Sequence, residues 1–328
     1  MLLLSKSDIK KVFSMKDAIE ADKLAFQMLE EGNCEVPLRV QIQAKDDKGT
    51  FLFMPAYSGA LGAAGLKVVN VFPDNTEKGL PTTPAQVFLV DGETGMVSAI
   101  MDGTYITQVR TGAASGAAFD LLAKKECEIG ALIGTGGQAA AQLEAMLVAR
   151  KLKEVRVVGR NYDRTVAFVE VMKEELKEYQ VQIVAVKTSD EAIENADLII
   201  TVTTATEPVF DGTKVKPGAT ISCVGGYQPH MQEIDPAVLP RTSKIYFDSQ
   251  TAVLSEAGDI LIPLEQGIIT EKNFTGNLGD VVRGVLNGRE NDEEIIVFKS
   301  VGVAVQDLVT AKAIYDKAVE KNIGHVWE

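Results

Sequence analysis

The sequence predicts an α/β protein with two parts, a Rossmann-type domain built on a doubly wound parallel sheet and an α+β domain. From about Thr107 onward, strand-like and helix-like segments alternate, which is typical of βαβ units. A glycine-rich turn, Gly134–Ala139, follows the first of these strands. Earlier strand-like segments follow one another across short turns, which favours an antiparallel sheet. We expect a Rossmann domain at residues 121–302 and an α+β domain at residues 1–120 with 303–328.

Composition is that of an ordinary globular protein. The chain has 328 residues, of which 46% are hydrophobic and 24% charged, so it is long enough for two domains with substantial cores. The formal net charge of −13 disfavours nucleic acids and anionic membranes as partners.

Cysteine use and the N-terminus indicate a cytoplasmic protein. The three cysteines, Cys34, Cys127 and Cys223, are scattered and odd in number, which argues against a disulfide framework or a zinc site. We expect three buried, unreactive thiols. The leucines at the start are too few for a signal peptide, and no segment reaches the roughly 18 apolar residues that span a bilayer.

The N-terminal part predicts one helix followed by strands. Residues Met15–Glu31 show helical spacing, with lysine and glutamate on the outer face. Turn sequences such as Asp46–Gly49 and Asp91–Gly95 separate the segments that follow. The predicted strands are Leu38–Gln43, Thr50–Met54, Gly65–Val71 and Gln86–Val90.

The rest of the chain predicts alternating elements. Thr111–Ala123, rich in alanine, glycine and serine, predicts a connecting helix. Val303–Lys321 predicts a long amphipathic helix that packs back on the N-terminal part and makes that domain discontinuous. Between them we expect strands at Ile129–Ile133, Glu154–Val158, Gln182–Ala185, Leu198–Thr201, Thr220–Val224 and Lys244–Phe247, and helices at Gln138–Arg150, Arg164–Glu178 and Ser189–Glu194.

The segment Gly134–Ala139 matches the G-x-G-x-x-G/A fingerprint in its required context, after an apolar strand and before a helix. Gly134 permits the tight turn, Gly136 lets the backbone approach a pyrophosphate, and Ala139 permits close packing of the helix on the strand. The free N–H groups of the helix N-terminus then favour the anion. The alternative is a glycine-rich turn that binds no nucleotide, which this context disfavours.

The end of the second strand bears on the choice of cofactor. An acidic residue there favours NAD, whereas an arginine accommodates the 2′-phosphate of NADP. The sequence has Arg160 and Asn161 at this position, with Arg164 following and Asp163 further along. We therefore expect NADP, with NAD possible. The alternative is that Arg160 is a solvated surface residue.

Three basic residues are candidates for binding a carboxylate substrate. Arg39 follows Val36-Pro37-Leu38, and Arg110 begins the small-residue helix. Lys67 lies inside an apolar strand, so it is either exposed at an edge or buried with a partner. An arginine pairs with a carboxylate through two parallel hydrogen bonds. Each residue, taken alone, is more often a structural or surface charge. We interpret Met101-Asp102-Gly103 as a turn.

Taken together, these segments resemble the ornithine cyclodeaminase/mu-crystallin family along nearly the whole chain. Their order and spacing are specific, although several are ordinary alone. The matching stretches are Gly65–Asn70 with Pro73-Asp74-Asn75, Asp91–Gly95, Met101–Gly103, Arg110–Ser115, Gly134–Gly136, Pro217–Ile221 with Val224-Gly225, and Lys299–Gly302 followed by Asp307.

The resemblance implies a homodimer whose N-terminal sheets pair, so the α+β domain would serve substrate binding and dimerisation. It implies that Arg39, Lys67 and Arg110 face the substrate carboxylate and the nicotinamide. The family's activities share hydride transfer at the carbon that bears nitrogen and carboxylate. The expected cofactor-binding residues are Thr111, Gly134, Thr135, Gly136, Gln138, Ala139, Arg160, Asn161, Arg164, Thr203, Val224 and Gly225.

One departure from the family pattern favours reduction over cyclodeamination. Cyclodeaminases carry an aspartate after the Val-Gly, and here Tyr227 takes its place. A tyrosine is a weak base, so proton transfer from a diamino acid becomes harder. We expect a reductase of a small cyclic imino acid, such as 1-pyrroline-2-carboxylate, with Lys67 and Tyr227 as catalytic candidates. The alternatives are an ornithine cyclodeaminase, an alanine-type dehydrogenase, or a non-catalytic ligand-binding protein like lens mu-crystallin.

Overall fold

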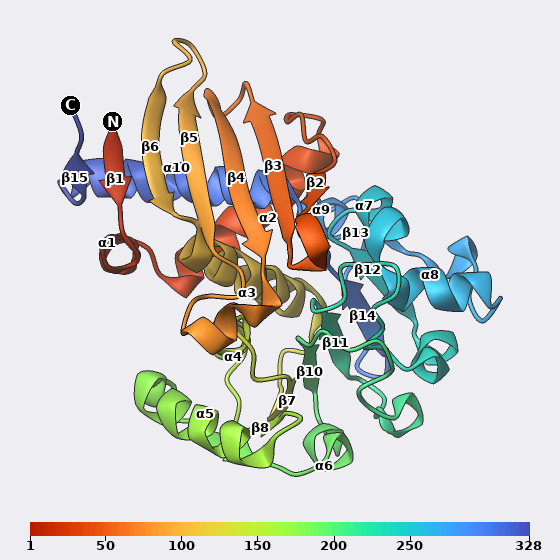
Figure 1. Cartoon of the computed structure of the whole chain (residues 1–328). Coiled ribbons are helices and arrows are strands. Elements are labelled where there is room, and N and C mark those ends of the chain that lie inside the picture. The colour runs from red at the N-terminus through yellow and green to blue at the C-terminus, as the bar shows by residue number, and fades with distance from the viewer. The chain divides into compact units, whose positions relative to one another are not determined.

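The computed structural model describes residues 1–75 and 77–328 (Figure 1). The chain forms two compact units: unit 1 is Met1–Arg110 with Val303–Glu328, and unit 2 is Thr111–Gly302. One division falls between Arg110 and Thr111, inside helix α3 (Gly103–Leu122) and before the boundary expected at residue 120. No helix within the described residues is long and apolar enough to cross a membrane.

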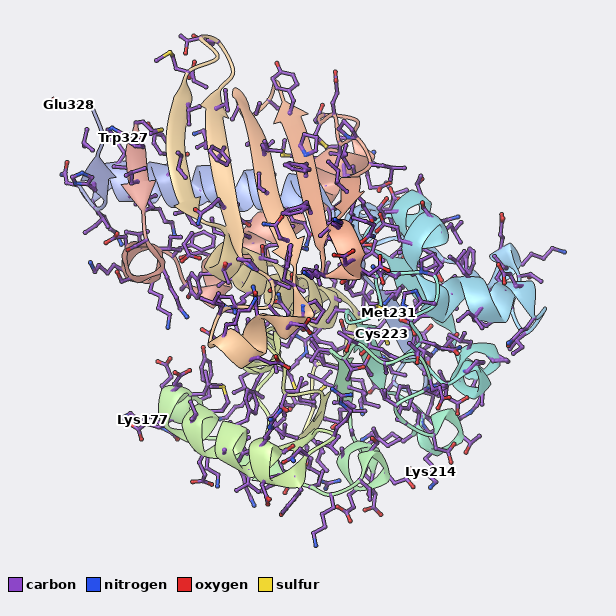
Figure 2. The ribbon with its side chains drawn as sticks, in the orientation of Figure 1. Lys177, Lys214, Cys223, Met231, Trp327 and Glu328 are labelled. Atoms are coloured by element: carbon purple, nitrogen blue, oxygen red, sulfur yellow. The ribbon has the colours of Figure 1, made fainter. Side chains whose placement is uncertain are left out.

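Unit 1 contains a seven-stranded sheet in the order β15-β1-β6-β5-β4-β3-β2. β1 pairs parallel with β6, and the other neighbours are antiparallel. Helix α10 crosses one face of this sheet, behind it in Figure 1, and packs on α2. Trp327 and Glu328 follow the edge strand β15 (Figure 2), and Trp327 N donates to Met1 O. The elements are β1 (Leu2–Leu4), α1 (Lys6–Val12), α2 (Met15–Glu30), β2 (Val40–Gln43), β3 (Thr50–Ser58), β4 (Ala63–Val71), β5 (Ala85–Asp91), β6 (Val97–Asp102), α10 (Ala304–Glu320) and β15 (His325–Val326).

Alternation along the strands of unit 1 separates two faces of the sheet. Met54, Lys67, Val87 and Met101 are neighbours across β3, β4, β5 and β6, and all four are buried on the face that α10 covers. The approach is close, since a Cβ on Gly65 would lie 3.1 Å from Leu308 Cδ1 of α10. The opposite face is also rich in apolar side chains, but these are half-buried or exposed.

Unit 2 contains an eight-stranded, wholly parallel sheet in the order β13-β12-β14-β11-β10-β7-β8-β9. The chain runs from β7 outward to β9 and then returns to β10 on the other side. Ligands of such sheets bind at this switch point, outside the carboxyl ends of the strands. The elements are β7 (Ile129–Ile133), α4 (Ala139–Ala149), β8 (Glu154–Val158), α5 (Tyr162–Glu175), β9 (Gln182–Ala185), α6 (Ser189–Ile193), β10 (Leu198–Thr201), β11 (Thr220–Cys223), β12 (Lys244–Phe247), α7 (Gln250–Glu256), α8 (Gly258–Glu265), β13 (Gly276–Asn277), α9 (Leu278–Val282) and β14 (Ile296–Lys299).

Local sequence explains where several helices begin. Ser14 accepts a hydrogen bond from Asp17 N, and the Asp17 carboxylate accepts one from Ser14 N in return. This reciprocal cap satisfies two of the donors that a helix leaves free at its start. Asn161 caps α5 in a similar way, because its Oδ1 accepts from Arg164 N at 2.9 Å.

Several predictions from the sequence are wrong in detail. Met101-Asp102-Gly103 is not a turn: Asp102 ends β6, Gly103 begins α3, and Asp102 Oδ1 accepts from Tyr105 N at 2.8 Å. The predicted helix at Thr111–Ala123 therefore starts earlier. Cys127 and Cys223 are buried as expected, but Cys34 is only half-buried.

Candidate active site

Lys67 occupies the centre of β4 on the face that α10 covers. Its side chain is fully buried, and its Nζ lies 2.7 Å from Asp307 Oδ2 on α10. Beyond this ion pair, the Lys67 ammonium has no hydrogen-bond partner among the residues that the structure describes. The lysine is thus buried with an acidic partner, one of the two arrangements that its sequence environment allowed. Its N–H groups remain available to a ligand.

Arg110, on the first half of α3, joins the same carboxylate. Its Nε donates to Asp307 Oδ1 at 3.2 Å, and its Nη1 donates to Gln306 Oε1 at 3.2 Å. Gln306 is fixed in turn, because its Nε2 donates to the buried Asp22 at 2.8 Å and its Oε1 accepts from Val303 N. Within the described part of the chain, Arg110 Nη2 has no hydrogen-bond partner, so one donor of the oriented guanidinium is unused.

The charges of this cluster favour a carboxylate ligand. Burial, together with the positive charges of Arg110 and Arg39, lowers the pKa of Lys67 to about 7 against the opposing effect of Asp307. When all are ionised, Lys67, Arg110 and Arg39 contribute three positive charges, and Asp307 and Asp22 two negative ones. One additional negative charge would balance the cluster and raise the pKa of Lys67.

The sequence predicted three members of this cluster and missed the rest. Arg39 is half-buried just before β2, close enough to Lys67 to affect its pKa. Asp307 was recognised only as part of a family stretch, and Gln306 and Asp22 not at all. The available signal was two polar residues inside the apolar run Val303–Val309. Polar groups on a buried helix face require partners.

The glycine-rich turn in unit 2 fits a pyrophosphate. Gly134 has φ +116°, and a Cβ there would lie 2.5 Å from Val202 O of the neighbouring strand, so the fold itself requires glycine. Gly136 differs, because a Cβ there would meet nothing within 4 Å. The N-terminus of α4 has no side-chain cap, and Gln138 Oε1 is buried without a partner among the described residues. The free backbone N–H groups at this N-terminus are what a bound diphosphate would use.

The other residues predicted to bind the cofactor lie around this turn in varied settings. Thr135 and Val224 are half-buried, and Ala139 is buried at the start of α4. Arg160 and Arg164 are exposed near the end of β8.

Other predicted cofactor residues already make hydrogen bonds within the protein. Thr111 O accepts from Gln142 Nε2 at 2.8 Å, and the Asn161 side chain caps α5. The N–H groups of Thr203 and Gly225 donate to Glu233, a carboxylate that sequence reasoning missed. Tyr227 is half-buried in the loop after β11.

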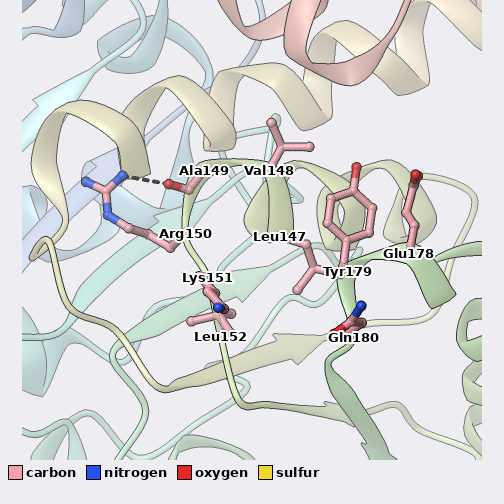
Figure 3. Close-up of a pocket in the computed structure, with 9 residues that line it drawn as sticks. All are labelled: Leu147, Val148, Ala149, Arg150, Lys151, Leu152, Glu178, Tyr179 and Gln180. Atoms are coloured by element: carbon pink, nitrogen blue, oxygen red, sulfur yellow. Dashed lines mark hydrogen bonds between the residues drawn. The ribbon is translucent and has the colours of Figure 1, made fainter.

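A separate pocket of about 440 Å³ lies elsewhere in unit 2 (Figure 3). Residues Leu147–Leu152 and Glu178–Gln180 line it, between the end of α4 and the segments that lead into β8 and β9. This is the amino edge of the parallel sheet, whereas dinucleotides bind at the carboxyl edge. Arg150 also directs its guanidinium to backbone carbonyls and Asp120. The pocket is therefore not the cofactor site.

A Rossmann unit with a fitting diphosphate turn, and a second unit with a buried Lys–Asp–Arg cluster, define a nicotinamide-dependent oxidoreductase of the amino and imino acid class. The whole-chain comparison agrees. Residues 1–322 match the sequence model of the Ornithine cyclodeaminase/mu-crystallin family, and the chain belongs to this family.

Known relatives match the chain from end to end. A Delta(1)-pyrroline-2-carboxylate reductase of Bacillus cereus is 36% identical over 99% of this chain and 98% of its own length. The Delta(1)-pyrroline-2-carboxylate reductase of Thermococcus litoralis, solved with NADH and L-proline, is 42% identical over 100% of both chains, with a TM-score of 0.94. An archaeal alanine dehydrogenase dimer with bound NAD is 33% identical over 100% of this chain and 99% of its own, with a TM-score of 0.90.

Proposed function

We propose that this protein is an NAD(P)H-dependent reductase of a small cyclic imino acid of the 1-pyrroline-2-carboxylate type. The main support is the buried Lys67–Asp307–Arg110 cluster. It has N–H donors without hydrogen-bond partners among the described residues, and one substrate carboxylate would balance its excess positive charge. The reductase relatives from Bacillus cereus and Thermococcus litoralis support the same substrate class.

The residues of each unit have distinct roles in this proposal. The turn Gly134–Ala139 of unit 2 would hold the reduced cofactor, which when bound would supply hydride to the carbon of the C=N bond that also bears the carboxylate. Arg110 Nη2 and Arg39 bind that carboxylate and orient the substrate. Lys67 stabilises the bound anion and gives a proton to the nitrogen as the C=N bond becomes CH–NH. Asp307 keeps the lysine and the arginine in place, and Tyr227 donates a further hydrogen bond or proton.

Two other activities are each supported by a specific observation, and the same substrate panel tests them. The archaeal relative supports oxidation of alanine, and family membership supports cyclodeamination of ornithine. Cyclodeamination needs a group that accepts protons from a diamino acid, and Tyr227 at the aspartate position is a weak base. We therefore place imine reduction first.

A substrate panel tests the assignment. The purified chain is assayed for NADPH and NADH oxidation with 1-pyrroline-2-carboxylate, for ammonia release from ornithine, and for NAD(P)⁺ reduction with alanine. We expect rapid oxidation of the reduced cofactor by the imine and little or no turnover of the two amino acids. Faster turnover of ornithine or alanine would transfer the assignment to that activity. Cofactor binding without any turnover would support a non-catalytic ligand-binding protein.

The choice of cofactor depends on Arg160. This exposed arginine at the end of β8 has no acidic neighbour at the strand tip, so we propose that it contacts the 2′-phosphate and that NADPH binds more tightly than NADH. Arg160→Asp is expected to weaken NADPH binding by about tenfold or more and to leave NADH binding nearly unchanged, because only NADPH carries the phosphate. Fluorescence titration of both cofactors measures this. Equal loss for both, or no loss, would contradict the role.

We also propose that the protein is a homodimer that acts in the cytoplasm. Its three cysteines are free thiols, which suits a reducing compartment. The outer face of the unit 1 sheet carries contiguous apolar side chains, and a face of this kind marks an interaction site. The archaeal alanine dehydrogenase relative is a dimer. The outer-face residues are Val40, Ile42, Phe51, Phe53, Pro55, Tyr57, Leu66, Val68, Phe88, Val90 and Ile100.

A charge in the middle of this face is expected to separate the subunits. Phe88 pairs with Leu66 on one neighbouring strand and Ile100 on the other, outside the core of unit 1. Phe88→Asp would place a carboxylate in the buried interface, so we expect a folded monomer by light scattering. The matched control is Trp327→Asp, which changes an exposed apolar residue next to the edge strand β15. This variant is expected to stay dimeric. A Phe88→Asp dimer would rule out this face.

A further inference from the structure

A second buried ionic cluster lies in unit 2, formed by Glu233, Asp259 and Lys299. The side chains of Asp259 and Lys299 are fully buried and joined by a 2.7 Å ion pair between Oδ2 and Nζ. Glu233 is equally buried, and its backbone N–H donates to Asp259 Oδ1 at 2.6 Å, with Ile234 N donating to the same oxygen at 2.9 Å. Asp259 thereby fixes the backbone that carries the Glu233 side chain.

The Glu233 carboxylate ties two loops together. Its Oε1 accepts from Thr203 N at 2.5 Å and from Thr203 Oγ1 at 2.9 Å. Its Oε2 accepts from Gly225 N at 2.8 Å and from Gly226 N at 3.1 Å. Thr203 follows β10 and the two glycines follow β11, so a single buried side chain joins the carboxyl ends of adjacent strands.

The cluster also explains why Gly225 and Gly226 are glycines. A Cβ on Gly225 would lie 2.1 Å from Thr203 O and 2.6 Å from Glu233 Oε1. A Cβ on Gly226 would lie 2.8 Å from Asp259 Oδ2. Gly225 and Gly226 therefore make room for Thr203 and the two carboxylates, and the cluster itself requires glycine at both positions.

The two loops that Glu233 joins, after β10 and β11, lie at the switch point of the sheet. β10 is the neighbour of β7, and a Cβ on Gly134 of the diphosphate turn would lie 2.5 Å from Val202 O, directly before Thr203. Tyr227 follows the two glycines immediately. Cys223, labelled in Figure 2, is the last residue of β11 and leads into these glycines. The part of a dinucleotide that extends beyond the diphosphate turn toward β10 and β11 is its nicotinamide half.

We propose that Glu233, supported by Asp259 and Lys299, is a positioning residue that holds Thr203 and Gly225–Tyr227 in the arrangement that receives the nicotinamide half of the cofactor. This inference rests on the proposed function, since it presumes a nicotinamide dinucleotide. Glu233 itself makes its four hydrogen bonds to protein groups and acts through the loops it joins. The turn at Gly134–Ala139 binds the adenosine diphosphate half independently of it.

The test compares Glu233→Gln with a matched variant, Asp197→Asn. The glutamine keeps the size of the side chain but turns an N–H₂ toward backbone N–H groups, which displaces one loop. Asp197 is also a buried carboxylate in unit 2; it accepts from Glu128 N at 2.7 Å and Ile129 N at 3.2 Å, at the amino ends of β7 and β10. Both substitutions remove a buried acceptor, but only the first touches the carboxyl edge.

The readout is the affinity of each variant for NADH and for ADP-ribose, which lacks the nicotinamide, measured by calorimetry well below the unfolding temperature. We expect Glu233→Gln to weaken NADH by about tenfold or more and ADP-ribose by less than about twofold. We expect Asp197→Asn to lower the melting temperature while leaving the ratio of the two affinities unchanged. If Glu233→Gln does not fold, Thr203→Val replaces it, because this substitution removes one of the four hydrogen bonds to Glu233. We expect Thr203→Val also to weaken NADH more than ADP-ribose, but by a smaller factor than Glu233→Gln.

The outcomes separate this inference from the proposed function. An unchanged NADH affinity in Glu233→Gln, or in Thr203→Val where that variant is used, would overturn it. An equal loss for NADH and ADP-ribose, or a wild-type chain that binds neither, would overturn it as well. The binding measurements need no substrate, so a chain that shows the expected ratio but reduces no imine would retain the positioning role and lose the proposed reaction.

Discussion

Replacing Lys67 with methionine is expected to lower turnover of the imino acid by at least about 100-fold, the low end for a positioned acid–base or electrostatic group. Methionine keeps the length of the side chain and removes its charge and its N–H donors. The pair with Asp307 at 2.7 Å and the donor to substrate are both lost. NADH affinity is expected to remain at the wild-type value, because the diphosphate turn belongs to the other unit. Steady-state kinetics and cofactor titration measure the two quantities separately.

The pH profile identifies which form of the lysine is active. The pKa of Lys67 is lowered to about 7, so the free enzyme loses its ammonium as pH rises through that value. If the ammonium is the proton donor, kcat/KM falls above about pH 7. Lys67→Arg keeps the positive charge at all these pH values and is expected to restore only part of the rate, without this fall. Near-normal turnover by Lys67→Met would show that the lysine is a structural charge.

A valine at Gly136 is expected to abolish dinucleotide binding and leave the fold intact. A Cβ at this position meets nothing within 4 Å and Gly136 has no positive φ, so nothing in the protein itself resists a side chain there. In our proposal, the pyrophosphate occupies the space that valine would fill. We expect at least about a 100-fold loss of NADH and NADPH affinity, with an unchanged melting temperature.

Gly134→Val is the informative comparison for that variant. Gly134 has φ +116°, and its Cβ would lie 2.5 Å from Val202 O, so a side chain disturbs the backbone of unit 2 itself. We expect a clear drop in melting temperature there, in contrast to Gly136→Val. Unchanged cofactor binding in Gly136→Val would mean that the glycine-rich turn serves folding alone.

The Rossmann unit was predictable from sequence because its central strands are apolar runs between helices. Ile129–Ile133, Glu154–Val158 and Leu198–Thr201 occur where they were predicted. Other strands escaped, including β1 at Leu2–Leu4 and β14 at Ile296–Lys299. The three residues of β1 are too few to show a period, and in β14 Lys299 resembles a surface residue until its partner Asp259 is placed beside it.

The candidate site was predictable to the extent that local sequence marked it. Lys67 stood out because a lysine inside an apolar strand requires an explanation, and the fingerprint stood out by its spacing. Asp307 and Glu233 could not be placed, because their roles depend on partners far away in sequence. Gly225 was predicted to bind the cofactor. The structure adds a second reason for a glycine at this position, because Thr203 and Glu233 approach it closely.

The fate of the hydride tests the central claim most directly. The chain is incubated with 1-pyrroline-2-carboxylate and NADPH that carries deuterium on the transferred position of C4, and the product is examined by mass spectrometry and NMR. The proposal predicts proline with deuterium at the carbon that bears nitrogen and carboxylate, and none above background with Lys67→Met. Absence of labelled proline from the wild-type chain, with ammonia released from ornithine in its place, would contradict it.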